Sequence, residues 1–233
     1  AKDDSAGLAI AERMNSQIRG MTVATRNAND GISFAQTGEG ALGKVGDMLQ
    51  RMRELAVQAA NGTNSSGDRN SLNNEYQQLA SEAARTMGGT QFNGTNILAA
   101  PTDSVFQVGA NTTAALDTIT VTKFDWTASA SITSAIGAAV GTPPAIAVAG
   151  TDGANATAAI TALDAAITAV NDGRATFGAV QNRFDNVVAN LMVNVENQTA
   201  ARSRIMDADY ATETSSLSRA SILQQAGNAM VAQ

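Results

Sequence analysis

Carboxylates are the main side chains of this 233-residue chain that could carry out acid–base or metal chemistry, because the sequence has neither His nor Cys. The missing imidazole and thiol groups exclude zinc fingers, cysteine nucleophiles and every triad with a histidine base. Acidic residues gather in three places: Asp3-Asp4, Asp117 with Asp125, and Asp207 and Asp209 with Glu213. None has the spacing of a calcium loop. Solvated helix faces explain them better than an opportunistic cation at Asp207 and Asp209. The sequence therefore predicts no catalytic residue, no metal site, no cofactor and no enzyme.

Binding of nucleotides, nucleic acids and membranes is disfavoured as well. Gly38-Glu39-Gly40 lies inside a helical pattern and follows no strand, as a phosphate-binding loop would require. The 21 acidic residues outnumber the 15 basic ones, which leaves no basic face for nucleic acid. The sequence contains no run of 18 or more apolar residues, which is the length that a membrane-spanning helix needs.

Composition and proline placement predict long helices. The chain holds 46 Ala and only 4% aromatic residues, which suits close-packed helical layers better than a thick core. All three prolines, Pro101, Pro143 and Pro144, fall in the middle. Two helical flanks are therefore expected around a different centre.

The C-terminal flank has the clearest periodicity. Steps of three and four residues give a seam in which ten of fourteen positions are large and apolar: Ile160, Leu163, Ile167, Val170, Arg174, Phe177, Gln181, Phe184, Val188, Leu191, Val195, Gln198, Arg202 and Ile205. About six heptads predict a coiled-coil helix roughly 70 Å long. Its four polar members would fix register. The alternative is an ordinary amphipathic helix against a globular core.

The N-terminal flank shows two seams that are out of phase, at residues 18–35 and 42–59. The slip falls among Gly38, Gly40, Gly43 and Gly46. Either the helix breaks there, or the glycines let another backbone come close, and the absence of proline favours close approach. Residues 61–67 form a turn, with Ser65 or Ser66 as the N-cap of a third helix that ends at Gly88-Gly89.

The segment between the two helical flanks has a different sequence pattern. Residues 105–108 and 119–124 predict two strands of a small hairpin region. Residues 127–158, rich in Ala, Ser, Thr and Gly, predict a weakly structured segment or a short surface excursion. The resulting division is 1–100 (N-terminal helices), 101–158 (hairpin and excursion), 159–206 (long C-terminal helix) and 207–233 (joint and terminal remnant).

Several long motifs in both flanks resemble bacterial flagellin. At the N-terminal end these are residues 1–10, Arg26-Asn27-Ala28-Asn29-Asp30-Gly31-Ile32-Ser33, Gln50-Arg51-Met52-Arg53-Glu54-Leu55 and Gln91-Phe92-Asn93-Gly94. At the C-terminal end they are Gly178-Ala179-Val180-Gln181-Asn182-Arg183-Phe184, Ala201-Arg202-Ser203-Arg204-Ile205, Asp209-Tyr210-Ala211-Thr212-Glu213 and Ile222-Leu223-Gln224-Gln225-Ala226-Gly227. The resemblance covers residues 1–111 and 160–233.

The resemblance implies a mainly α fold, an elongated rod of long coiled-coil helices with a small β-hairpin region. It implies a secreted structural subunit that assembles into the flagellar filament on the cell surface. The implied partners are other flagellin subunits and the flagellar cap, hook-junction and export-chaperone proteins. The family's extreme ends are expected to be missing before Ala1 and after Gln233, with the joint to an inner domain at residues 207–210. A chain without those pairing ends is expected to be monomeric.

Flagellins that resemble this chain are bound by the vertebrate flagellin receptor, and the resemblance maps that site onto Arg51, Leu55 and Glu75. Arg51 would be an anchor and Leu55 the apolar centre of the contact. The alternative is that these residues serve subunit packing. A further alternative function is a flagellin-like adhesin that binds a surface polysaccharide, for which Trp126 offers one stacking residue.

Overall fold

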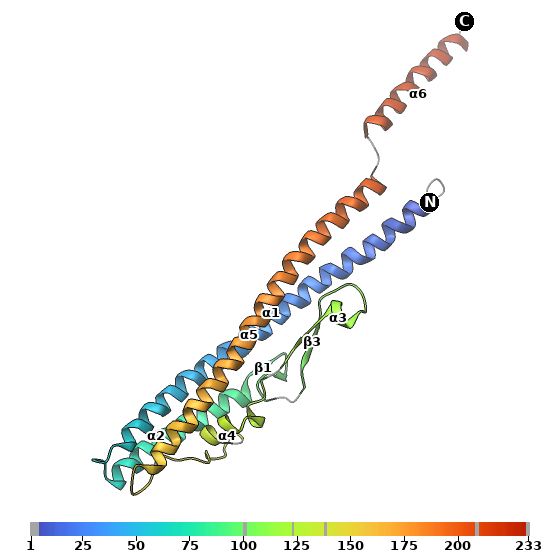
Figure 1. Ribbon diagram of the computed structural model, residues 1–233. Coiled ribbons are helices and arrows are strands. Elements are labelled where there is room, and N and C mark those ends of the chain that lie inside the picture. Colours follow the sequence, from blue (N-terminus) through green and yellow to red (C-terminus); the bar gives the residue numbers. More distant parts are fainter. Residues whose placement is uncertain (1–4, 100–101, 123, 138, 208–209, 232–233) are drawn as a thin grey trace.

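The computed structural model describes residues 5–99, 102–122, 124–137, 139–207 and 210–231, and most of them form an elongated helical rod (Figure 1). Two long helices, α1 (Ser5–Ala60) and α5 (Ala154–Met206), run in opposite directions side by side along its length. A shorter helix, α2 (Ser66–Gly89), lies against α1 at one end, and small strands and short helices fill the side of the rod. The predicted fold class is confirmed.

The predicted C-terminal seam forms the contact between α5 and α1. Five of its apolar members, spaced seven residues apart, are buried: Leu163, Val170, Phe177, Phe184 and Leu191. The other seam positions are half-buried, except Arg174 and Ile205, which are exposed. A seven-residue repeat keeps one face of α5 turned toward α1 over most of the helix. The long helix is therefore confirmed, and it begins six residues before the seam.

The glycines of α1 do not break the helix. A Cβ at Gly31 would lie closer than 3 Å to three ring atoms of Phe184, and one at Gly38 would lie 2.8 Å from Cζ of Phe177. At Gly40 no atom lies within 4 Å of the corresponding position. The expected approach of another backbone at residues 38–46 is therefore wrong, because aromatic side chains fill the space at Gly38 and solvent fills it at Gly40. Gly31 and Gly38 are one heptad apart, as are Phe184 and Phe177, so the rings fix the register of the two helices.

This contrast gives a matched pair of substitutions. Gly31→Ala should destabilise the protein by about 1–3 kcal/mol, because the added methyl overpacks against Phe184. Gly40→Ala, in the same helix, should stabilise it by up to about 1 kcal/mol, because alanine has the better helix propensity and meets open space. Urea unfolding followed by circular dichroism measures both. Equal effects for the two variants would contradict the role given to Phe184.

Helix α2 begins and ends close to the predicted residues. Ser65 is the N-cap, and its hydroxyl accepts a hydrogen bond from the Asp68 backbone N–H while the Asp68 carboxylate accepts one from the Ser65 N–H at 2.9 Å. This capping box satisfies two backbone donors at the start of the helix. The hydrogen bonds from Ser65 lower the pKa of Asp68. The predicted cap at Ser65 and the end at Gly89 are confirmed.

Two small antiparallel hairpins pack beside the long helices. The predicted pair consists of β3 (Ser104–Gln107) and β4 (Thr118–Val121), joined by a connection that contains the short helix α3 (Ala114–Asp117). The other pair, β1 (Gln91–Phe92) and β2 (Thr95–Asn96), was not predicted. Its turn is Asn93-Gly94, and both residues have positive φ angles of 49° and 76°. The Asn-Gly dipeptide is a strong hairpin signal and could have revealed it.

Four phenylalanines connect these hairpins to the helices. Phe34 of α1 makes edge-to-face contacts with Phe92 of β1 and Phe106 of β3, at ring-centroid distances of 5.9 and 5.6 Å. Phe106 meets Phe184 of α5 in the same way at 5.5 Å. Such geometry suits the quadrupoles of aromatic rings. Four of the nine aromatic residues of the chain therefore lie where four elements meet.

The expectation for residues 127–158 is wrong at both ends of the segment, where helices form, whereas residues 139–153 contain no helix or strand. The 3-10 turn η1 (Trp126–Ala128) leads into helix α4 (Ala130–Ile136), which packs on α2 and α5. Ile132, Ile136 and Val148 are fully buried. This segment is rich in Ala, and its few large apolar residues are too sparse to form a periodic pattern. The sequence therefore did not indicate that they attach the segment to the rod. Ala138 lies outside the described residues.

Tyr76 of α2 contributes to the attachment of α4 to the rod. Its ring is fully buried, and its hydroxyl donates a hydrogen bond to the Ala135 carbonyl of α4 at 3.3 Å. Burial raises the pKa of Tyr76 to about 12. The neutral phenol is therefore favoured in the folded state. Its contribution to stability is complete below the unfolded-state pKa near 10 and is lost as the pH rises from about 10 to 12.

In Tyr76→Phe, the loss of stability between pH 9 and pH 12 should be about 2 kcal/mol smaller than in the unaltered protein, because no phenol ionises on unfolding at this position. Denaturant titrations at several alkaline pH values provide the measurement. Identical pH profiles for the two proteins would contradict the assignment.

Helix α6 (Tyr210–Val231) extends beyond the end of α5 (Figure 1). Its described side chains, from Ala211 to Val231, are exposed, including Leu217, Ile222 and Leu223. Ala208 and Asp209 of the predicted joint lie outside the described residues, as do Asp3 and Asp4. Within the described part of the chain, no helix combines the length and apolar character that crossing a bilayer requires.

Candidate partner-binding surface

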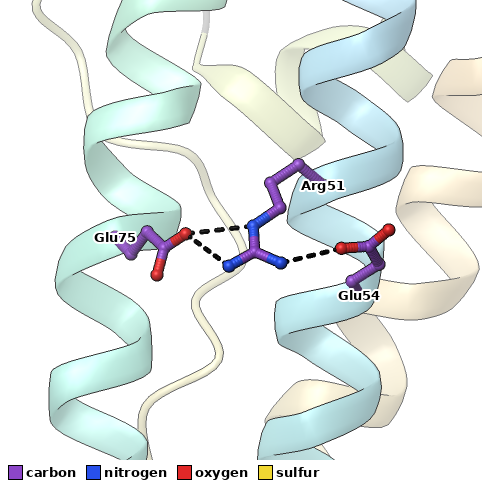
Figure 2. Close-up of polar contacts among 3 residues, drawn as sticks. All are labelled: Arg51, Glu54 and Glu75. Carbon is purple, nitrogen blue, oxygen red and sulfur yellow. Dashed lines mark hydrogen bonds and ion pairs between the residues drawn. The ribbon is translucent and has the colours of Figure 1, made fainter.

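Arg51 of α1 and Glu75 of α2 come together between the two helices, as Figure 2 shows. The Glu75 Oε1 atom accepts hydrogen bonds from Arg51 Nε at 3.1 Å and Nη2 at 2.9 Å. On the opposite edge of the guanidinium, Nη1 donates to Glu54 Oε2 at 2.8 Å. Arg51 thus lies between a carboxylate of its own helix and one of the neighbouring helix.

These three charges remain accessible. The side chains of Arg51, Glu54 and Glu75 are 51%, 66% and 48% exposed. Hydrogen bonds to Glu54 and Glu75 raise the pKa of Arg51, which is protonated at any physiological pH. Exposed ion pairs contribute little to stability, because solvent screens them. A partner could therefore exchange these bonds for its own at small cost to the fold.

Leu55 does not belong to this exposed surface. Its side chain is 1% exposed and lies in the hydrophobic core with Met52, Ala56 and Ala59. The sequence interpretation of Leu55 as an exposed apolar contact is corrected here, because the core-facing side of α1 includes residue 55. In this structure Leu55 supports the helix that carries Arg51.

A second exposed pair lies on another side of α1 and was not singled out from the sequence. Arg53 Nε donates to Asp164 Oδ1 of α5 at 2.6 Å, and this hydrogen bond lowers the pKa of Asp164. The pair borders a groove of about 670 Å³ with the half-exposed Val57. Residues 51 and 53 lie about 200° apart around a helix, so one motif presents arginine to two neighbours.

Three other residues singled out from the sequence, Asp117, Asp125 and Trp126, have structural roles. Asp117 is 7% exposed and accepts hydrogen bonds from the backbone N–H groups of Asn111 and Thr113, at 3.3 and 3.0 Å. Asp125 caps η1 through the Thr127 N–H. Trp126 is 1% exposed, so its ring is not available to stack on a sugar. The adhesin alternative therefore has no support.

Two family descriptions match the chain. Residues 1–102 match the bacterial flagellin N-terminal helical region, and residues 160–233 match the bacterial flagellin C-terminal helical region. Together they cover more than half of the sequence and correspond to the flanks that form the rod.

Similar proteins agree. The flagellin of Halalkalibacterium halodurans is 46% identical over 234 residues, which cover 100% of this chain and 81% of that protein. The flagellin of Bacillus subtilis is 41% identical, with 100% and 83% covered. The crystal structure of Bacillus cereus flagellin matches with a TM-score of 0.59 and 37% identity over 71% of this chain and 88% of that one. A putative flagellar hook-associated protein from Vibrio parahaemolyticus, 12% identical, shares the fold with a TM-score of 0.71 over 87% of this chain and 99% of that one.

Flagellin is a structural protein of the flagellar filament on the cell surface, and its subunits assemble with one another. The paired helical flanks, the rod that they build and the relatives that align over the whole sequence lead to one conclusion. The chain belongs to the bacterial flagellin family and is a structural subunit of the flagellar filament.

Proposed function

We propose that the surface formed by Arg51, Glu54 and Glu75 is a recognition site on the depolymerised subunit for the vertebrate flagellin receptor. The observation that carries the proposal is the guanidinium of Arg51, which joins two helices while half of its side chain stays exposed. Arginine is a frequent anchor at protein interfaces because its planar group forms several directed hydrogen bonds. The same exposed charges suit packing against neighbouring subunits, so receptor and filament can use one surface.

Arg51→Ala should reduce receptor signalling by the depolymerised protein about tenfold or more, as expected when an interface anchor is lost. A reporter cell line that expresses the receptor provides the measurement. Arg85→Ala is the matched control, because Arg85 is an exposed arginine of α2 that pairs with Glu82 outside this surface.

Circular dichroism should show both variants folded. Signalling by Arg51→Ala at the level of the unaltered protein would sink the proposal. Leu55 is unsuitable for this test, because truncating a core residue would lower activity through unfolding.

We also infer the finer properties that follow from membership of the family. The subunit is secreted, contacts the flagellar cap, hook-junction and export-chaperone proteins, and carries no catalytic activity. The four-part division at residues 100, 158 and 206 remains our proposal for its organisation.

A further inference from the structure

A groove with aromatic walls lies where α1, β1 and β3 meet, about 30 Å along α1 from Arg51. We call it the aromatic groove. Its volume is about 500 Å³, and the half-buried rings of Phe92 and Phe106 line it. The buried ring of Phe34 contacts both of them edge to face and holds them in place. A concave, largely apolar site of this size with a few polar groups is typical of small-molecule binding.

The charge in the aromatic groove is negative. Among the described residues that line it, Asp30 of α1 is the one with a charged side chain. Asp30 is exposed and takes part in none of the six ion pairs that the described residues form, although Arg26 lies one turn earlier on the same helix. A basic residue that precedes its acidic partner by four positions has the less favourable order on a helix. The carboxylate can therefore pair with a cation from outside the chain.

Two amide side chains of the aromatic groove already use their donors within the protein. Asn27 Nδ2 donates to the Gln107 carbonyl at 2.9 Å. Gln107 Nε2 donates to the carbonyls of Gly109 and Asn111, at 3.0 and 2.8 Å. A ligand in the groove therefore meets a carboxylate and aromatic rings, whose faces carry partial negative charge. These groups suit a cation that has no N–H donor of its own to satisfy.

From these observations we propose that the aromatic groove binds small organic cations of the trimethylammonium class. The methyl groups of the cation pack against Phe92 and Phe106, and its charge lies near Asp30. The ring quadrupoles and the carboxylate both attract such a cation. A primary ammonium group is a compact and strongly hydrated charge, so its transfer into an aromatic site costs more. The groove therefore favours the methylated cation.

Choline and neohexanol test the proposal in the intact chain. Neohexanol is the neutral isostere of choline, in which a carbon atom replaces the nitrogen. Titration of isotope-labelled protein, followed by nuclear magnetic resonance at constant ionic strength, measures both affinities. Choline should shift the backbone amide signals of the groove residues and bind about fivefold more tightly than neohexanol, or better. Equal affinities would mean that the groove selects only apolar shape, and shifts confined to other residues would mean that choline binds elsewhere; either result would overturn the proposal.

Two substitutions separate the effect of the carboxylate from that of the rings. Asp30→Asn keeps the shape of the side chain and should weaken choline binding about fivefold or more, with neohexanol binding unchanged. Phe92→Leu keeps an apolar side chain without a π system and should weaken choline binding about threefold. Asp185→Asn is the matched control, because Asp185 is an exposed carboxylate of α5 outside the groove.

The control variant Asp185→Asn should bind choline as the unaltered protein does. Choline affinity that is unchanged in Asp30→Asn, or that falls equally in Asp30→Asn and Asp185→Asn, would refute the proposal. Circular dichroism of each variant excludes loss of folding as the cause.

Discussion

Phe184→Ala is expected to lower the free energy of unfolding by about 3–5 kcal/mol, the range for removal of a buried aromatic ring. Phe184 is fully buried and touches two other elements of the rod. Its ring faces Gly31 of α1 and meets Phe106 of β3 edge to face at 5.5 Å. Glycine has no side chain that could move into the vacated space, so the cavity should persist. Urea denaturation followed by far-ultraviolet circular dichroism measures the change.

Val193→Ala is the matched control for Phe184→Ala. Val193 lies on the same helix but is 57% exposed. Its truncation should change the free energy of unfolding by no more than about 0.5 kcal/mol. A loss of less than 1 kcal/mol in Phe184→Ala would show that the ring does not hold α1 and α5 together.

Arg69→Leu is expected to destabilise the protein by about 3–5 kcal/mol. Arg69 is 3% exposed and donates to three carbonyl oxygens, Ala59 at 2.9 Å, Asn61 at 3.1 Å and Thr151 at 3.2 Å. These carbonyls belong to the last turn of α1, the turn before α2 and the segment that leads into α5. Leucine fills similar space but satisfies none of them. The bond to Ala59 is buried and the other two are part-buried, and a hydrogen bond to a charged group contributes about 1.5–3 kcal/mol. The positive charge also suits the C-terminal end of α1.

Two substitutions delimit the cause of the effect at Arg69. Arg85→Leu removes an arginine of the same helix that is 66% exposed, and it should cost no more than about 1 kcal/mol. Arg69→Lys keeps the charge, but a single ammonium lacks the planar fork that reaches three acceptors, so an intermediate loss is expected in the same denaturation assay. If Arg69→Lys were as stable as the unaltered protein, charge rather than hydrogen-bond geometry would explain the residue.

The long helices could be predicted because their periodicity extends over many turns. The seam through Phe177 and Phe184 identifies α5 and its buried face, and Ser65 with Asp68 marks the start of α2. Periodicity could not predict which residue of another element packs against each buried residue. Gly31 and Gly38 appear in the sequence only as weak helix formers, and their function depends on the rings of Phe184 and Phe177, which lie 153 and 139 residues away in the chain.

The candidate site was predictable only in part for a similar reason. The motif that contains Arg51 indicated a functional surface, but the faces of α1 are assigned by what packs against them. Leu55 is buried because other elements cover its side of the helix, whereas Arg53 and Asp164 pair across a contact that sequence separation concealed. In the centre, α4 depends on three or four apolar side chains, too few for a periodic signal.

The opposite directions of α1 and α5 have an electrostatic consequence for packing. Each peptide unit carries a dipole along the helix axis, so helices of 56 and 53 residues have large macrodipoles when considered separately. Because the two run antiparallel at almost equal length, the positive N-terminal end of each helix lies at the same end of the rod as the negative C-terminal end of the other, and the two macrodipoles largely cancel. A rod of this kind can be aligned with many identical rods in the same direction without dipolar repulsion accumulating between them.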